Sequence, residues 1–358
     1  MDAAGSPFIE FSHSDSAAFE RKQMKKVLTL VAAASAMALV VGTGSAVNAA
    51  DTTLNIQMVS KGFQHQFWQA VRTGSEQAGK ALNAKITFVG PESESMVDKQ
   101  LEQLQAAIDS KPDAIGYASL DPKAPLALLK KAKDAGIPVY MFDAAAGDPK
   151  DATQNEASLG ASSNIALGIA RTDGVAASAL AADKMAALIR NKGTVFVISH
   201  SQVNATGIQR RDGFVNRMKA KYPKIKVLPV QYGDGDHLKS ADIVKAVIAA
   251  NKGLVGVFAT NEGGAIGAVD AFKELKLKRG KIKLIGFDSG AAQIGAIKSG
   301  LMNGAITQDP IGIGYKTVAA LVGKVRSNTI PKNFIDTGFY YYNAKNLTDP
   351  KIAAVLYQ

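Results

Sequence analysis

The sequence predicts an α/β protein with two doubly wound, parallel sheets. From Leu54 onward, short apolar runs alternate with longer amphipathic stretches. The runs lack strict alternation of apolar and polar residues, which is typical of parallel strands covered by helices on both faces. Two blocks of this pattern, Asp51–Asp143 and Thr194–Gln308, flank a Gly/Ser/Asn-rich stretch, Ala144–Thr172. This organisation predicts two lobes with a cleft between them.

The individual elements follow from hydrophobic periodicity and from repeated strand–helix units with right-handed crossovers. Strands are predicted at Leu54–Val59, Lys85–Val89, Ala114–Ala118, Pro138–Phe142, Thr194–Ser199, Lys226–Gln231, Leu254–Ala259 and Lys283–Phe287. Helices are predicted at Gln66–Leu82, Val97–Asp109, Ala124–Ala135, Val175–Arg190, Ile208–Lys221 and Ser240–Ala250.

The composition excludes several classes of protein. The chain has 358 residues, 47% of them hydrophobic, and no cysteine. These values exclude a disordered chain, a disulfide scaffold, a cysteine nucleophile and metal sites built on thiolates. The formal net charge of +11 fits nucleic acid, an anionic membrane or a lysine-rich surface.

The first fifty residues are expected to be a targeting segment rather than part of the fold. Lys25 and Lys26 precede an uncharged apolar run, Val27–Val41, and small residues close the segment at Val47-Asn48-Ala49. This pattern is typical of a cleavable signal peptide at residues 24–50, and the run is shorter than the roughly 20 residues of a membrane span. We therefore expect a freely soluble periplasmic protein, and we leave residues 1–23 out of fold reasoning.

The positive charge belongs to the part of the chain expected to be exported. Residues 1–50 hold four basic and four acidic residues, so removing them leaves the net charge at +11. Export argues against a nucleic-acid partner. We interpret the charge as a lysine surface dispersed over the protein, of use near an anionic membrane.

Enzyme, metal and cofactor motifs do not match. The chain has no GxxxxGK[ST], HExxH or GxSxG pattern, and residues 261–267 depart from GxGxxG. His65, His200 and His237 lie too far apart for a spaced metal motif, so neither a metal nor a cofactor is predicted. His200 lies between Ser199 and Ser201, and a Ser–His pair is the alternative to a polar loop that lines the cleft. We favour the loop.

Polar and aromatic side chains follow the predicted strands at the ends where ligands bind in such sheets. The candidate site residues are Phe67, Trp68, Asp143, Arg210, Asn261, Asp288 and Gln308. Carboxylates accept hydrogen bonds from vicinal hydroxyls, Arg and Asn donate, and an aromatic ring covers the apolar face of a sugar. Asp143, Asn261 and Asp288 are also candidates for helix N-caps, and the aromatic pair for the core. Together the set favours a polyhydroxylated ligand.

These residues resemble those of the periplasmic substrate-binding proteins of ABC sugar importers, the ribose/galactose-type (type I) group. The likeness covers nearly all of Asp51–Gln358. It is carried by the aromatic pair, Asp143, Arg210-x-x-Gly213-Phe214, residues 258–262, residues 285–288 and residues 306–310, and also by Ile335-Asp336-Thr337-Gly338 followed by Asn346-Leu347.

The resemblance implies two discontinuous lobes joined by a three-segment hinge, with crossings near Asp173, Gln308 and Tyr341. The first lobe comprises residues 51–172 and 309–340, and the second comprises residues 173–308 and 341–358. It implies that these seven candidates, together with His65 by its position just before the aromatic pair, bind a monosaccharide or sugar derivative. Hinge closure around the ligand would present the protein to a permease in the inner membrane.

The resemblance leaves other functions open. A sensory protein that presents a sugar-like signal to a chemoreceptor or sensor kinase shares the fold. The effector domain of a transcriptional repressor shares it too, but the leader and the missing helix-turn-helix argue against that function. A glycosidase would need Asp143 and Asp288 as its acid and base, and neither has an evident reason for a raised pKa. We therefore predict a binding protein without catalytic residues.

Overall fold

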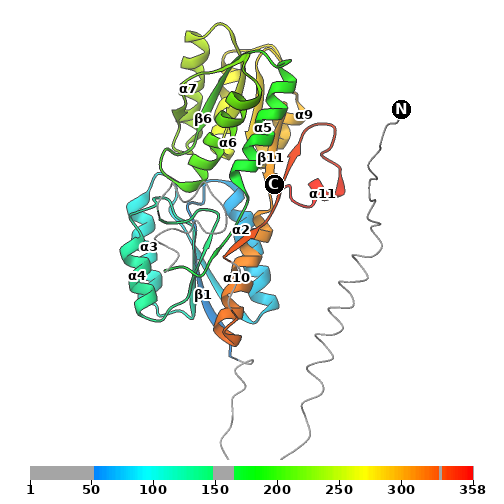
Figure 1. Ribbon diagram of the computed structural model, residues 1–358. Coiled ribbons are helices and arrows are strands. Elements are labelled where there is room, and N and C mark those ends of the chain that lie inside the picture. Colours follow the sequence, from blue (N-terminus) through cyan, green and yellow to red (C-terminus); the bar gives the residue numbers. More distant parts are fainter. Residues whose placement is uncertain (1–51, 148–164, 330–332, 358) are drawn as a thin grey trace, which may run out of the picture. The chain divides into compact units, whose positions relative to one another are not determined.

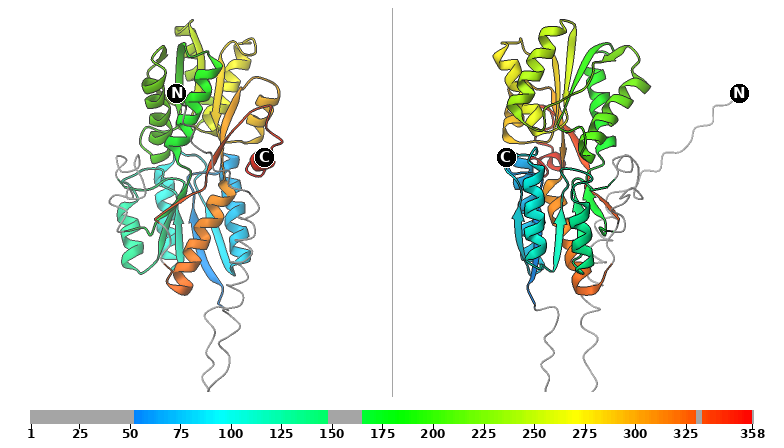
Figure 2. Two further views of the ribbon diagram at one scale, coloured as in Figure 1. Left: turned by 45° about the vertical axis from the view of Figure 1, so that its right-hand side comes forward. Right: turned by 90° about the vertical axis from the view of Figure 1, so that its left-hand side faces the viewer.

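The computed structural model describes residues 52–147, 165–329 and 333–357, which all belong to the compact unit Asn48–Gln358. Two sheets dominated by parallel strands each carry helices on both faces (Figure 1). Figure 2 shows the same two layered bodies in two further views. The predicted α/β class with two doubly wound sheets is confirmed.

The first sheet is parallel throughout and has the strand order β12-β5-β4-β3-β1-β2. Its strands are β1 (Leu54–Val59), β2 (Ala84–Val89), β3 (Ala114–Tyr117), β4 (Val139–Phe142), β5 (Ile169–Arg171) and β12 (Phe334–Asp336). Helices α2 (Gln66–Ala81) and α10 (Pro310–Ser327) share one apolar cluster with the sheet. Helices α3 (Val97–Asp109) and α4 (Leu126–Asp134) share the other, so both faces are covered.

The second sheet has the order β13-β11-β10-β9-β6-β7, and β8 pairs with β6. Its strands are β6 (Gly193–Ser199), β7 (Ile225–Val227), β8 (Gln231–Tyr232), β9 (Leu254–Ala259), β10 (Lys283–Phe287), β11 (Gly304–Gln308) and β13 (Phe339–Tyr342). Only β13, among these, is antiparallel to its neighbour.

Helices cover both faces of the second sheet as well. Helices α5 (Gly174–Leu188) and α6 (Ala205–Lys221) pack on one face. Helices α7 (His237–Ala250), α8 (Glu262–Glu274), α9 (Ala291–Lys298) and the short α11 (Pro350–Ala353) pack on the other. We call each sheet with its helices a lobe, first and second in chain order.

Side chains define where several helices begin. The N-caps whose side chains accept a backbone N–H are Asp173, Asn204, Asp236, Asn261, Asp309 and Asp349. Each satisfies a donor that the first turn leaves unpaired. Glycine permits close helix contact at Gly213, where a Cβ atom would lie 2.5 Å from the Val175 carbonyl oxygen.

One predicted strand is divided in two. The run Lys226–Gln231 forms the end of β7 and the start of β8, which both pair with β6. Pro229 lies between them and has no N–H to donate to a ladder, so the pairing is interrupted there. Four strands were not predicted, namely β5, β11, β12 and β13. They have three to five residues each.

The chain passes between the sheets three times. It leaves the first sheet after β5, returns after β11, and leaves again between Asp336 of β12 and Phe339 of β13. The last crossing was expected near Tyr341, but Tyr341 lies inside β13 opposite Ile306. The turn at Gly338, with φ of +80°, makes the change of sheet three residues earlier.

Two predictions concern residues that the structure does not describe. The leader at 24–50 lies outside the described residues, and so does most of the stretch Ala144–Thr172. In the part of the chain that is described, no helix is both long and apolar enough to cross a membrane.

Candidate functional site

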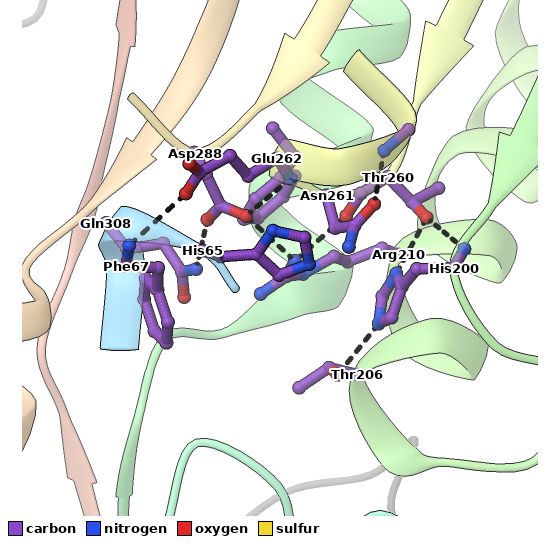
Figure 3. Close-up of polar contacts among 12 residues, drawn as sticks. His65, Phe67, His200, Thr206, Arg210, Thr260, Asn261, Glu262, Asp288 and Gln308 are labelled. Carbon is purple, nitrogen blue, oxygen red and sulfur yellow. Dashed lines mark hydrogen bonds and ion pairs between the residues drawn. The ribbon is translucent and has the colours of Figure 1, made fainter. Parts of the chain in front are cut away.

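One cavity between the lobes gathers all eight of the predicted side chains. Lys61, Glu94 and His200 complete its lining. The lining residues are Lys61, His65, Phe67, Trp68, Glu94, Asp143, His200, Arg210, Asn261, Asp288 and Gln308. The residues that follow β1, β2 and β4 face those that follow β6, β9 and β10, because both sheets point the carboxyl ends of their strands at the cavity. Figure 3 shows part of this arrangement.

The aromatic pair, Phe67 and Trp68, belongs to the hydrophobic core and also lines the cavity. The rings of Phe67 and Trp68 pack edge to face at 4.8 Å, and both belong to an apolar cluster of the first lobe. Their exposed fractions are 4% and 1%. Trp68 Nε1 donates a hydrogen bond to Glu94 Oε1 at 2.8 Å, which fixes the edge of the indole at the cavity.

The two aspartates share an uncommon backbone conformation. Asp143 follows β4 with φ of +54°, and Asp288 follows β10 with φ of +79°. Left-handed backbone at non-glycine residues is strained, and such strain concentrates at functional sites. Neither residue is the N-cap of a helix that follows it, since the N-cap of α9 is Gly290 and residues 144–147 after Asp143 are not helical.

Asn261 does cap a helix, as the alternative reading expected. Its Oδ1 accepts a hydrogen bond from Gly264 N at 2.8 Å at the start of α8. Its Nδ2 is buried at the cavity wall without a hydrogen-bond partner among the described residues. The cap therefore holds an amide donor that is free for a ligand.

Arg210 of α6 lies between the two aspartates. Its Nη2 is 3.9 Å from Asp143 Oδ1 and its Nη1 is 3.8 Å from Asp288 Oδ2. Nη1 also donates to the Thr260 carbonyl at 2.8 Å, and the guanidinium lies 3.8 Å above the centre of the Phe287 ring. This stacked and bonded cation holds its donors in a fixed geometry.

Lys61 is a site residue that the sequence analysis did not select. It lies two residues after the end of β1 and is 2% exposed. Its Nζ lies 2.9 Å from Asp143 Oδ2 and donates to Thr206 Oγ1 of the second lobe at 3.2 Å. A lysine within two residues of the end of a buried strand was the available signal for its role.

Glu94 was also missed, and no feature of the sequence separates it from Glu92. It lies in the loop between β2 and α3 and is partly buried. Burial opposes its ionisation, but the charge of Lys61, the two cavity histidines and the hydrogen bond from Trp68 together outweigh that effect and lower the pKa of Glu94 to about 2. The cavity therefore holds an ionised carboxylate at neutral pH.

Both histidines of the cavity are buried. Burial lowers the pKa of His65, and it lowers that of His200 further. The His200 ring nitrogens lie 2.8 Å from Thr260 Oγ1 and 3.1 Å from Thr206 Oγ1. His200 thus forms part of a polar cavity wall, and its ring is bonded to threonines instead of Ser199 or Ser201.

Asp288 is the centre of a hydrogen-bond network. Gln308 Nε2 donates to its Oδ1 at 2.6 Å, and the backbone N–H of Glu262 donates to its Oδ2 at 3.0 Å (Figure 3). Burial raises its pKa, against the effect of Arg210. The carboxylate is held in place with lone pairs left for a further donor.

The charges of the cavity are paired internally. Its two cations, Lys61 and Arg210, each lie within 4.0 Å of a carboxylate. Three carboxylates face them, those of Glu94, Asp143 and Asp288. Across the described ranges, no group of three or more His, Asp or Glu side chains has the arrangement of a metal site.

Comparison with known proteins identifies the family. A sequence model of the periplasmic binding protein domain matches residues 56–328. The galactofuranose-binding protein YtfQ of Escherichia coli is 27% identical over 294 residues, which cover 81% of this chain and 84% of that protein.

Two solved structures are similar in sequence as well as in fold. Both are ABC transporter solute-binding proteins from Agrobacterium vitis. One, bound to α-D-tagatopyranose, is 34% identical with a TM-score of 0.79 and covers 86% of this chain and all of its own. The other, bound to D-fucose, is 31% identical with a TM-score of 0.77 and covers 85% of this chain and all of its own. The chain belongs to the periplasmic binding protein family.

Proposed function

We propose that the protein binds a neutral monosaccharide or sugar derivative in this cavity and delivers it, from the periplasm, to the permease of an ABC importer. The observation that carries this proposal is the convergence of paired charges, amides and an aromatic wall from both lobes on one small cavity. The sugars bound by the two Agrobacterium vitis proteins support the ligand class.

The charge pairing argues for an uncharged ligand. Lys61 and Arg210 already face Asp143 and Asp288, so neither offers an uncompensated positive charge to a sugar acid or a phosphate. Carboxylates with free lone pairs accept hydrogen bonds from hydroxyl groups, and the Asn261 amide donates one. An analogue that lacks one hydroxyl leaves a buried partner unpaired, which gives selectivity.

The lining of the cavity indicates how a ligand enters it. The cavity wall comes from both lobes, so the ligand enters and leaves only when the lobes separate. We propose that the two lobes, joined by the three crossing segments, open and close as rigid bodies.

A ligand screen tests the proposal. Thermal unfolding of the purified protein is measured with pentoses, hexoses, polyols, sugar acids and sugar phosphates. A neutral sugar at 100 times its Kd should stabilise the fold by about 2.7 kcal/mol, whereas the acids and phosphates should have little effect.

The control for the screen is Asp288→Asn, which keeps the size of the side chain and removes its charge. It should fold but give no shift with the same sugar. A shift only with sugar acids would contradict the neutral ligand, and no shift with any compound of the panel would contradict the ligand class.

A further inference from the structure

The positive charge of the protein is concentrated in one lobe. Residues 173–308 and 337–357 of the second lobe hold 22 Lys and Arg against 11 Asp and Glu. The described residues of the first lobe hold 14 against 12. The expectation of a dispersed lysine surface was therefore wrong, because almost all of the excess lies in the second lobe.

Within the second lobe, the excess gathers in the turns that lead from helices into strands. Four such turns, residues 189–192, 222–224, 251–253 and 275–282, contain eight Lys and Arg and no Asp or Glu. All eight side chains belong to exposed residues, and the structure assigns no ion pair to any of them. The equivalent turns of the first lobe, residues 82–83, 110–113 and 135–138, hold one Lys and one Asp.

The topology brings these four turns together. They precede β6, β7, β9 and β10, which are adjacent in the order β10-β9-β6-β7. In a parallel sheet all turns that enter strands lie at the same edge, opposite the carboxyl ends. In Figure 1 this edge is the end of the second lobe farthest from the first. We call the four turns the basic pole.

We propose that the basic pole is a docking surface for an anionic phospholipid bilayer. This inference rests on the proposed function in one respect: a protein that delivers its ligand to a membrane permease works close to a bilayer surface. Lysines that are exposed together attract an anionic leaflet without any specific pocket. Binding would concentrate the protein near the permease in two dimensions.

The composition of the pole favours a bilayer over a nucleic acid. Six of its eight cations are lysines, which are compact, strongly hydrated charges. Single-stranded nucleic acid is usually held by aromatic stacking, but Tyr222, the aromatic residue of these turns, donates its hydroxyl to Asp183. Leu275 is 40% exposed among the cations, which suits shallow contact with lipid headgroups.

The position of the pole leaves the sugar cavity free. The strands between them have mostly five to seven residues, which span about 16–23 Å at roughly 3.3 Å per residue. This separation exceeds the Debye length of about 8 Å at physiological ionic strength. Charge changes at the pole should therefore leave sugar affinity unchanged.

The test is co-sedimentation of the purified protein with vesicles of phosphatidylcholine that contain either 40% or no phosphatidylglycerol. The wild type should bind the anionic vesicles at least tenfold better and should be released by 0.5 M salt. The variant K276E/K278E/R279E/K281E should bind the anionic vesicles at least tenfold more weakly than the wild type. The neutralised variant K276Q/K278Q/R279Q/K281Q should show an intermediate loss of vesicle binding. It replaces the charge-reversal variant in this test if that variant does not fold.

A matched control changes the net charge by the same amount elsewhere. Lys80, Lys85, Lys111 and Lys123 are exposed residues of the first lobe, and the variant K80E/K85E/K111E/K123E should keep most of the vesicle binding. An equal loss in this control, or equal wild-type binding to uncharged vesicles, overturns the proposal. Tighter binding to a double-stranded oligonucleotide than to anionic vesicles at equal phosphate concentration also overturns it.

The sugar screen separates this proposal from the proposed function. Vesicle binding is measured without sugar, and sugar binding without vesicles. A pole variant that keeps its thermal shift with sugar but loses vesicle binding supports both. If the protein binds vesicles through the basic pole but no sugar shifts its thermal unfolding, the membrane-docking proposal is supported and the proposed sugar binding is contradicted.

Discussion

Glu262 and Gln66 cap helices in each other's lobe. The Glu262 carboxylate, at the start of α8, accepts hydrogen bonds from the backbone N–H groups of Gln66 and Phe67 at 3.1 and 3.2 Å, where α2 begins. The side chain of Gln66 accepts the backbone N–H of Ala291 at 2.6 Å, where α9 begins. These bonds satisfy helix donors across the lobes and exist only while the lobes are together.

The reciprocal caps should stabilise the closed form without touching the ligand. At pH 5, below the raised pKa of Glu262, Glu262→Ala removes two hydrogen bonds worth about 1 kcal/mol each, so the apparent Kd for the sugar should rise roughly tenfold or more. Calorimetric titration measures the change. Glu274→Ala, at the other end of α8, is the control and should keep the wild-type Kd. Wild-type affinity in Glu262→Ala would show that these bonds do not contribute to closure.

Sugar affinity should depend on pH through Glu262. Burial and the neighbouring Asp288 raise the pKa of Glu262 to about 7 in the closed form, whereas its ordinary value is 4.5. Asp288 lies in the same lobe and keeps its effect when the lobes separate, so only the burial of the carboxylate against α2 belongs to closure. Through that part of the shift closure takes up a proton, so this contribution favours closure at low pH and is lost as pH rises through 7.

The variant Glu262→Gln isolates this contribution, because its side chain stays neutral at every pH. From pH 5 to 8, the wild type should lose at least about tenfold in affinity relative to the variant, which corresponds to one pKa unit or more. His65 and His200 titrate in both proteins and cancel in the ratio. A ratio that is constant with pH would contradict the assignment to Glu262.

Substitutions of Lys61 and Asp143 should have non-additive effects on the free energy of unfolding, whereas each should abolish sugar binding. Lys61→Met leaves the carboxylate of Asp143 buried with only the more distant Arg210, and breaking such a pair costs about 3–5 kcal/mol. Adding Asp143→Asn should recover much of the unfolding free energy, measured by denaturant titration. Sugar binding should be lost in both variants. A double variant that binds like the wild type would remove both residues from the ligand site.

Trp68 should report ligand binding by fluorescence. It is the one tryptophan of the chain, it lines the cavity, and its Nε1 donates to the ionised Glu94. A sugar that contacts Glu94 or closes the lobes changes the surroundings of the indole, so emission should shift on titration. Asp288→Asn should show no shift at the same sugar concentration. If calorimetry shows that a sugar binds but the Trp68 emission does not change, the ring belongs only to the hydrophobic core and not to the ligand site.

Much of the site could be predicted because of one topological rule. Asp143 and Asp288 each follow a strand directly, and parallel strands end at a common edge, so residues distant in sequence were expected to meet. The short strands β5 and β12 could not be predicted in the same way. Their three residues are stabilised by pairing within the sheet and carry no periodic signal of their own.

The sequence by itself determined the α/β class, the two-block organisation and the chemistry that follows each strand, because hydrophobic periodicity and strand ends are local properties of the chain. Only the tertiary structure decided which charged residues act together. Lys61, Glu94 and Glu262 owe their burial or their pKa to contacts across the cavity, between segments far apart in the sequence. The +11 charge was visible in the composition, but its concentration at one pole arises because a parallel sheet places all its entry turns at one edge.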